Sequence, residues 1–95
     1  MSVTVKFVGT LRNAAGKSSM IIHCSPLFSV KNLIQKILLD IPDIKTTVIL
    51  YQAVGSIKNN VLILVNGREI SVLNGLDTQL YNDDEVVIIP VAHGG

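Results

Sequence analysis

The chain has 95 residues, the size of one small domain, with 8 Lys and Arg against 7 Asp and Glu and a formal net charge of +1. No run of Lys and Arg marks a surface for nucleic acid, and no stretch reaches the roughly 18 continuous apolar residues of a membrane span. A core this small leaves little room for a deep, water-excluding active site, so the length favours a carrier or binding module over an enzyme.

The cysteine and histidine content points to a cytoplasmic protein without a metal site. The chain begins without a basic region followed by a long apolar stretch, and its one cysteine, Cys24, cannot form an internal disulfide. Both features are typical of a reducing cytosol. A zinc site made of Cys24, His23 and His93 is rejected because these residues have no ligand spacing and lack a fourth ligand. Cys24 is expected to be a small buried hydrophobe.

Two strands are predicted near the N-terminus. Over residues 3–8, Val3, Val5 and Phe7 alternate with Thr4 and Lys6, which is the period of a strand with one buried face. A polar connection over residues 9–17 follows, and an apolar, β-branched run resumes over residues 19–24. We therefore predict a hairpin with a long loop.

One main helix is predicted after Pro26. Six apolar residues at helical spacing form a single stripe: Val30, Leu33, Ile34, Ile37, Leu38 and Ile41. Ser29 is expected to cap the first turn, because its hydroxyl can accept a free backbone amide. Pro42 restricts the residue before it, so the helix should end by Ile41. Residues 43–60 are compatible with a second short helix or with a strand over residues 48–51.

The second half of the chain is predicted to hold three strands. An apolar run over residues 61–65 precedes Asn66-Gly67, a pair that favours a type I′ turn, so a hairpin to residues 69–72 is expected. The last strand covers residues 86–89, and Pro90, which lacks an amide donor, is expected to end regular pairing. This order favours an α+β fold in which one main helix packs on one face of a mixed sheet. The predicted core comprises Val5, Phe7, Leu33, Ile34, Ile37, Val86 and Ile88.

The chain ends in two glycines, Gly94 and Gly95. A carboxylate becomes an acyl electrophile only after conversion to a mixed anhydride such as an adenylate, and the activating enzyme must thread the tail into a narrow channel. Glycine permits such a close approach because it has no Cβ. Residues 90–95 span at most about 20 Å when extended, which is long enough to enter the site of another protein.

Several motifs carry a resemblance to a known family. They are Val3-Thr4-Val5-Lys6-Phe7, Leu11-Arg12 with Gly16, Val65-Asn66-Gly67 and, most specifically, Asp84-Glu85-Val86-Val87-Ile88-Ile89-Pro90 running into Gly94-Gly95. The chain resembles the β-grasp sulfur-carrier family: the small subunit of molybdopterin synthase (MoaD), the thiazole sulfur carrier (ThiS) and the ubiquitin-related modifiers. It is most similar to the molybdopterin synthase small subunit or to an archaeal-type ubiquitin-like modifier. The resemblance implies a ubiquitin-like β-grasp domain over residues 1–89 and a flexible tail over residues 90–95.

Three positions depart from the pattern of the molybdopterin synthase subunits. Those subunits often have a second proline at the position of Val91, a glycine at that of Asp84 and a small hydroxyl residue at that of His93. A histidine before the terminal glycine pair is more similar to the eukaryotic ubiquitin-related modifier.

The resemblance implies a carrier and not an enzyme, at most the small non-catalytic subunit of molybdopterin synthase, with no catalytic residue, metal or bound cofactor. Gly95 is implied to be adenylated and thiocarboxylated, with Ala92, His93 and Gly94 inside the channel of an E1-like enzyme that uses ATP. Its sulfur is expected to enter molybdopterin, which makes the large synthase subunit a second partner. The alternatives are a modifier conjugated to lysines, a sulfur donor for tRNA thiolation, or a structural interaction domain with an idle tail.

A partner-docking face is predicted on the sheet. The runs over residues 61–65 and 86–89 are apolar on both faces, although one helix covers only one face of a sheet. Exposed apolar patches usually mark partner surfaces. Alternation places Val8 on the face opposite Val5 and Phe7, and the resemblance adds Val87 and Ile89 to it. The alternative is that residues 43–60 fold over this face.

Overall fold

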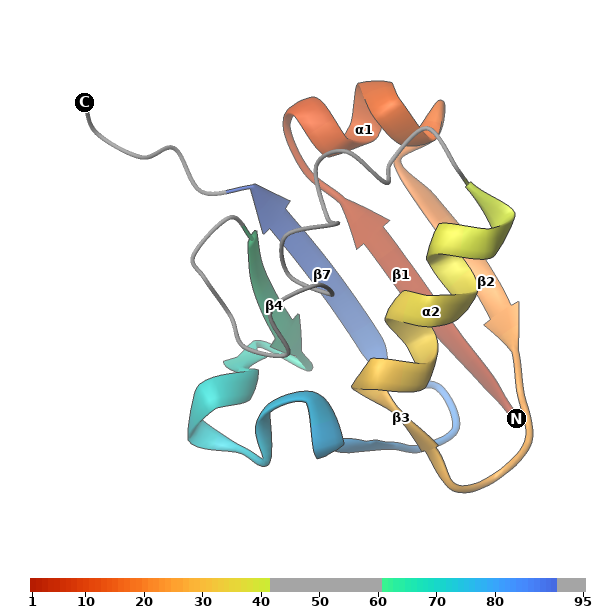
Figure 1. The fold of residues 1–95 in the computed structure, drawn as a ribbon, viewed down its shortest axis with the longest axis vertical. Helices are drawn as coiled ribbons and strands as arrows, with labels where there is room; N and C mark the ends of the chain where they lie inside the picture. Colours follow the sequence, from red (N-terminus) through yellow and green to blue (C-terminus); the bar gives the residue numbers. More distant parts are fainter. Residues whose placement is uncertain (42–60, 91–95) are drawn as a thin grey trace.

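The computed structural model describes residues 1–41 and 61–90, which form a mixed sheet with one main helix, α2 (Val30–Asp40), across one face (Figure 1). In spatial order the strands are β2 (Ser19–His23), β1 (Ser2–Phe7), β7 (Glu85–Pro90), β4 (Val61–Val65) and β5 (Arg68–Glu69). A second, two-stranded sheet pairs β3 (Phe28–Ser29) with β6 (Gln79–Leu80). The predicted α+β, ubiquitin-like β-grasp architecture is confirmed.

The first and last strands are parallel neighbours in the centre of the sheet. β1 pairs with β7 so that Val5 lies opposite Val86 and Phe7 opposite Ile88. β2 is antiparallel to β1, and β4 is antiparallel to β7. The predicted N-terminal hairpin is therefore present, and both termini of the domain contribute to its two central strands.

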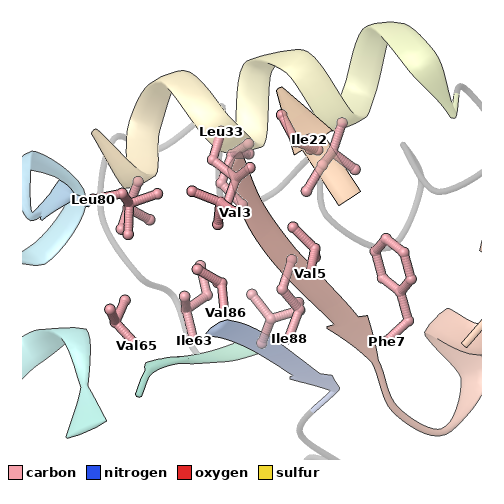
Figure 2. Packing of buried hydrophobic residues seen from close by; sticks show 14 of the residues in the cluster. Val3, Val5, Phe7, Ile22, Leu33, Ile63, Val65, Leu80, Val86 and Ile88 are labelled. Atoms are coloured by element: carbon pink, nitrogen blue, oxygen red, sulfur yellow. The ribbon is translucent and has the colours of Figure 1, made fainter. Parts of the chain in front are cut away.

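The core lies between the sheet and α2 (Figure 2). Alternate residues of β1 and β7 point to the helix, which buries its own apolar stripe against them. All the predicted core residues are at most 3 % exposed: Val5, Phe7, Leu33, Ile34, Ile37, Val86 and Ile88. Val3 of β1 and residues of the other elements complete the core, including Leu11, Ile22, Ile63, Ile70 and Leu80.

α2 begins as predicted, at a capped serine. The Ser29 hydroxyl accepts the backbone N–H of Asn32 at 3.2 Å, and the Ser29 backbone N–H donates to the Asn32 side-chain oxygen at 3.0 Å. This reciprocal pair satisfies two amides at the helix start. The helix ends at Asp40, one residue before the predicted limit at Ile41.

The connection over residues 9–17 is not the polar loop that we predicted. It contains a short helix, α1 (Thr10–Ala15), that buries Leu11 completely. Gly16 ends this helix in the left-handed conformation, with its N–H donating to the carbonyls of Arg12 and Asn13. Six residues with one buried side chain are too few to display a helical period in the sequence.

The hairpin predicted to reach residue 72 is shorter than expected. Asn66 and Gly67 both have positive φ, as the Asn-Gly pair predicts, but β5 has only two residues and a 3₁₀ helix (Ile70–Val72) follows it. The Glu69 carboxylate accepts the Ser71 backbone N–H, and Ile70 turns into the core. Burial of Ile70 together with this cap accounts for the turn in place of a longer strand.

The end of β7 also differs from the prediction. Pro90 is the last described residue of the strand, opposite Val61 of β4, so the strand extends one residue beyond the predicted end at residue 89. Proline is compatible with the last position of a strand, where the missing donor disrupts no further ladder. The helix or strand predicted within residues 43–60 lies outside the described residues, as does the alternative that this segment covers the sheet. No helix in the described ranges is long and apolar enough to cross a membrane.

Candidate functional site

The predicted tail residues, Ala92, His93, Gly94 and Gly95, lie outside the described residues. The last described residue is Pro90, from which the tail continues. Figure 1 shows that the carboxyl end of β7 and the N-terminus lie at opposite ends of the sheet. The position of Pro90 therefore determines where on the domain the tail starts.

Pro90 lies between two other segments of the same chain. On one side it lies opposite Val61, which is fully buried. On the other it lies near Gly9, where an added Cβ would come within 3.2 Å of the Pro90 Cγ. Gly9 has φ 63° and ψ −134°, a conformation that side chains disfavour. The Val8 N–H donates to the Ile88 carbonyl at 3.2 Å, which keeps this segment beside β7. The tail thus starts from a fixed point of the sheet.

The predicted docking residues lie on the face of the sheet that faces away from α2. Val87 and Ile89 are half-buried, since their neighbours Val86 and Ile88 take the helix-facing positions. Val8 follows β1 and is also half-buried. The structure therefore brings the three predicted residues to one face.

Two leucines of β4, which we did not assign to this face, extend it. Leu64 lies directly opposite Val87, and Leu62 lies opposite Ile89. Leu62 is 38 % exposed and Leu64 is half-buried. The signal was present in the sequence, because the run over residues 61–65 is apolar on both faces. We call Val8, Leu62, Leu64, Val87 and Ile89 the outer patch.

One ion pair borders the outer patch. The Lys6 Nζ lies 3.0 Å from the Glu85 Oε2, and both side chains are about half exposed. Lys6 lies opposite Val87 in the β1–β7 register. The result is an apolar centre with a charged edge, the composition typical of a protein-binding surface.

The acidic residues before β7 have a structural role in the described part of the chain. The Asp84 carboxylate accepts the Asn66 side-chain amide at 2.9 Å and the Tyr81 backbone N–H at 2.8 Å. The Asn66 side-chain oxygen accepts the Glu85 N–H at 2.9 Å. These bonds tie the turn before β7 to the turn after β4.

Cys24 is half-buried beside the N-terminus. Its carbonyl accepts the Met1 amino group at 2.8 Å, and its N–H donates to the Met1 carbonyl at 2.9 Å. Over residues 1–41 and 61–90, no group of three or more His, Cys, Asp and Glu side chains is arranged to hold a metal ion. His93 lies outside these ranges.

Comparisons with known proteins agree with this architecture. The model of the ThiS family matches residues 5–95. No curated protein matches the chain. Among solved structures, small archaeal modifier protein 1 of Methanosarcina acetivorans is similar with a TM-score of 0.82 and 28 % identity, over 99 % of this chain and 96 % of that chain.

Two further solved structures have the same fold. Urm1 from Trypanosoma brucei has a TM-score of 0.76 and 26 % identity, over 99 % of this chain and 95 % of that chain. A candidate subunit 1 of molybdopterin converting factor from Pyrococcus furiosus has a TM-score of 0.74 and 22 % identity, over 97 % of this chain and 99 % of that chain. Since the family match covers nearly the whole chain, this protein belongs to the ThiS family, whose members are small sulfur carriers and ubiquitin-like modifiers and not catalysts.

Proposed function

We propose that this protein carries sulfur on the carboxyl group of Gly95. In the first step, the Gly95 carboxylate attacks the α-phosphorus of ATP in an E1-like enzyme, which forms an acyl adenylate and releases pyrophosphate. A persulfide sulfur then attacks the carbonyl carbon and AMP leaves. A thiol reduces the resulting acyl disulfide and so releases the thiocarboxylate. ATP is used by the activating enzyme, and the carrier itself needs no bound cofactor.

The observation that carries this proposal is the extent of the family match, which runs through the terminal residue Gly95. The position of Pro90 in the sheet supports it further. For an activating enzyme that docks on the domain, the distance from Pro90 to the Gly95 carboxylate then has a fixed upper limit. That limit is about 20 Å.

The proposed acceptor of the sulfur is a molybdopterin precursor, with the large subunit of molybdopterin synthase as the second partner. A similar fold in the candidate molybdopterin converting factor subunit supports the idea, although at 22 % identity that likeness concerns the fold alone. In this reaction the thiocarboxylate sulfur displaces a leaving group from a carbon of the precursor and forms a C–S bond. Water then cleaves the resulting thioester, which leaves the sulfur on the precursor as a thiolate and regenerates the Gly95 carboxylate.

A second function, conjugation to lysines or sulfur donation to tRNA, is favoured by a different observation. The structures at 28 % and 26 % identity are named small archaeal modifier protein 1 and Urm1. In conjugation, a lysine amine attacks the activated Gly95 carbonyl and forms an isopeptide bond. The intact mass of the protein from its native cell separates sulfur carriage, whether to molybdopterin or to tRNA, from conjugation to lysines. Exchange of one oxygen for sulfur indicates the carrier, and Gly95-linked lysine adducts indicate the modifier.

The decisive experiment alters the tail and leaves the domain unchanged. Deletion of Gly95 moves the carboxylate back by about 3.5 Å, and Gly94→Val adds a branched side chain next to an unmoved carboxylate. Such transfers depend on sub-ångström placement, so each variant should lose ATP–pyrophosphate exchange with the cognate E1-like enzyme. Both proteins should melt like the wild type. Exchange at the wild-type rate after deletion of Gly95 would contradict the carrier and modifier functions together.

We propose that the outer patch is the surface on which the activating enzyme docks. Its partly exposed apolar side chains lead along the sheet to Ile89 and Leu62, next to the start of the tail, and such surfaces favour protein partners. Ile89→Asp puts a charge at the centre of the patch and should sharply weaken binding to the E1-like enzyme. The matched control is Leu39→Asp, since Leu39 is 80 % exposed on α2, which lies on the opposite side of the sheet. Unchanged binding of Ile89→Asp would exclude the patch as the docking surface.

A further inference from the structure

The β2 strand forms one edge of the five-stranded sheet in the described part of the chain. Cys24 and Met1 exchange both of their backbone hydrogen bonds, at 2.8 and 2.9 Å, which sets the alternation along the β1–β2 ladder. The N–H and C=O groups of Ser19, Ile21 and His23 therefore point away from β1. In the parts of the chain that the structure describes, no strand pairs with them.

The two edges of the sheet are protected to different degrees. β5, the other edge, has two residues, Arg68 and Glu69, and turns at once into a 3₁₀ helix. A short, charged strand is a common protection against edge pairing. β2 is Ser-Met-Ile-Ile-His, which contains no Lys, Arg, Asp, Glu or Pro, and its Ile21 side chain is 61 % exposed. The β2 edge thus offers backbone donors and acceptors together with an apolar side chain.

We propose that β2 pairs with β2 of a second copy of this chain. The pairing is antiparallel about a two-fold axis through Ile21. Ile21 then lies opposite Ile21 of the second copy, and Ser19 lies opposite His23. Each of these three residues then faces a residue of the second copy whose backbone N–H and C=O also point outward, so each pair can exchange two hydrogen bonds.

A second copy fits this edge better than a charged peptide would. The strand carries no Lys, Arg, Asp or Glu, and the whole chain has a formal net charge of +1, so two copies meet with little repulsion. The contact of the two Ile21 side chains covers an apolar group on each copy. A five-residue edge forms a small interface, and the dimer is therefore weak and concentration-dependent.

The arrangement leaves the proposed carrier site accessible. In the sheet order, β1 separates β2 from β7, and the outer patch lies on β7, on β4 and just after β1. The second copy therefore extends the sheet at the edge away from β4. Because the dimer does not involve Gly95, its test is independent of the proposed function.

A charge exchange at the two-fold axis tests both the contact and its register. In a symmetric pair, residue 21 meets itself, so Ile21→Lys alone and Ile21→Glu alone each place like charges opposite one another. Each variant should be monomeric in sedimentation equilibrium at concentrations where the wild type associates. An equimolar mixture should recover a dimer, because the new ammonium group then lies opposite the new carboxylate. The same exchange at Leu39, an exposed residue of α2, should change nothing.

Amide hydrogen exchange provides a second readout for the unmodified protein. The amides of Ser19, Ile21 and His23 should become protected as the wild-type concentration rises, while those of β5 should not. The proposal is overturned if the wild type stays monomeric with these amides unprotected. It is equally overturned if Ile21→Lys and Ile21→Glu both dimerise alone, or if their mixture does not associate. Ile21 is exposed, so both variants should keep the wild-type circular dichroism spectrum and melting temperature.

Discussion

The two faces of the sheet are built from the same strands but have different properties. On the helix side, Val5 of β1 and Ile88 of β7 are completely buried in an aliphatic core. On the outer side, Val87 and Ile89 are only partly buried, and the half-exposed Lys6–Glu85 ion pair lies beside them. Adjacent residues of one strand therefore have different roles. Because side chains alternate between the two faces of a strand, one residue packs in the core and the next lies on a surface suited to binding a partner.

The largest expected effect is on the helix side of β7. Ile88→Ala should lower the free energy of unfolding by about 2–5 kcal/mol, because it removes buried methyl groups and leaves a cavity. Ile89→Ala is the matched control: the same residue type, one position along, on the outer face. Its cost should be smaller than that of Ile88→Ala, because part of the Ile89 side chain is exposed to solvent in the folded protein. Denaturant unfolding of both variants measures the difference. Equal decreases in the free energy of unfolding would show that side chains on the two faces contribute equally to stability.

An intermediate effect is expected at Gly9, where the chain passes the end of β7. Gly9→Ala should cost about 1–3 kcal/mol, because it places a side chain in a strained backbone conformation. The new Cβ would also press on the Pro90 ring at 3.2 Å. Gly16→Ala is the control: Gly16 also has positive φ, but a Cβ added there would meet no atom within 4 Å. Gly16→Ala should therefore cost less.

The double variant Gly9→Ala/Pro90→Ala separates the two causes at Gly9. If the contact with the Pro90 ring contributes, the combined cost measured by unfolding should be smaller than the sum of the two single costs. Additive costs would attribute the whole effect to the backbone conformation.

The smallest effect is expected at the ion pair on the outer face. Lys6→Gln should change the free energy of unfolding by less than about 1 kcal/mol, because both partners are half-solvated. The change should shrink further at high salt, where the pair in the wild type is screened. If Lys6→Gln lowered the free energy of unfolding at physiological salt as much as Ile88→Ala does, the outer face would contribute as much to stability as the core does.

Most of the fold was predictable where a periodic pattern is long enough to read. The alternation over residues 3–8 and the stripe from Val30 to Ile37 each repeat several times, so they predicted the correct buried faces. The short helix over residues 10–15 and the strands of two residues have no such repeats. Their existence depends on contacts with distant parts of the chain, as the pairing of Phe28 with Leu80 illustrates.

The candidate site divides in the same way. The apolar character of residues 61–65 and 86–89 was readable from the sequence and led to the outer patch. The Gly-Gly terminus was also readable and led to the role proposed for Gly95. The direct pairing of Leu62 and Leu64 with Ile89 and Val87 was not readable, because the register between two strands far apart in the chain is set by how both pack under α2.

By itself, the sequence determined which residues are buried in β1, β7 and α2, where α2 starts, and how the chain ends. These features follow from local periodicity, capping and composition, which need no knowledge of distant neighbours. Only the tertiary structure decided that Leu11 and Ile70 turn into the core, that Pro90 lies between Gly9 and Val61, and that β2 is an edge strand of the sheet formed by the described residues. Each of these depends on which segments meet in space, because burial and strand pairing are satisfied by partners far away in the chain.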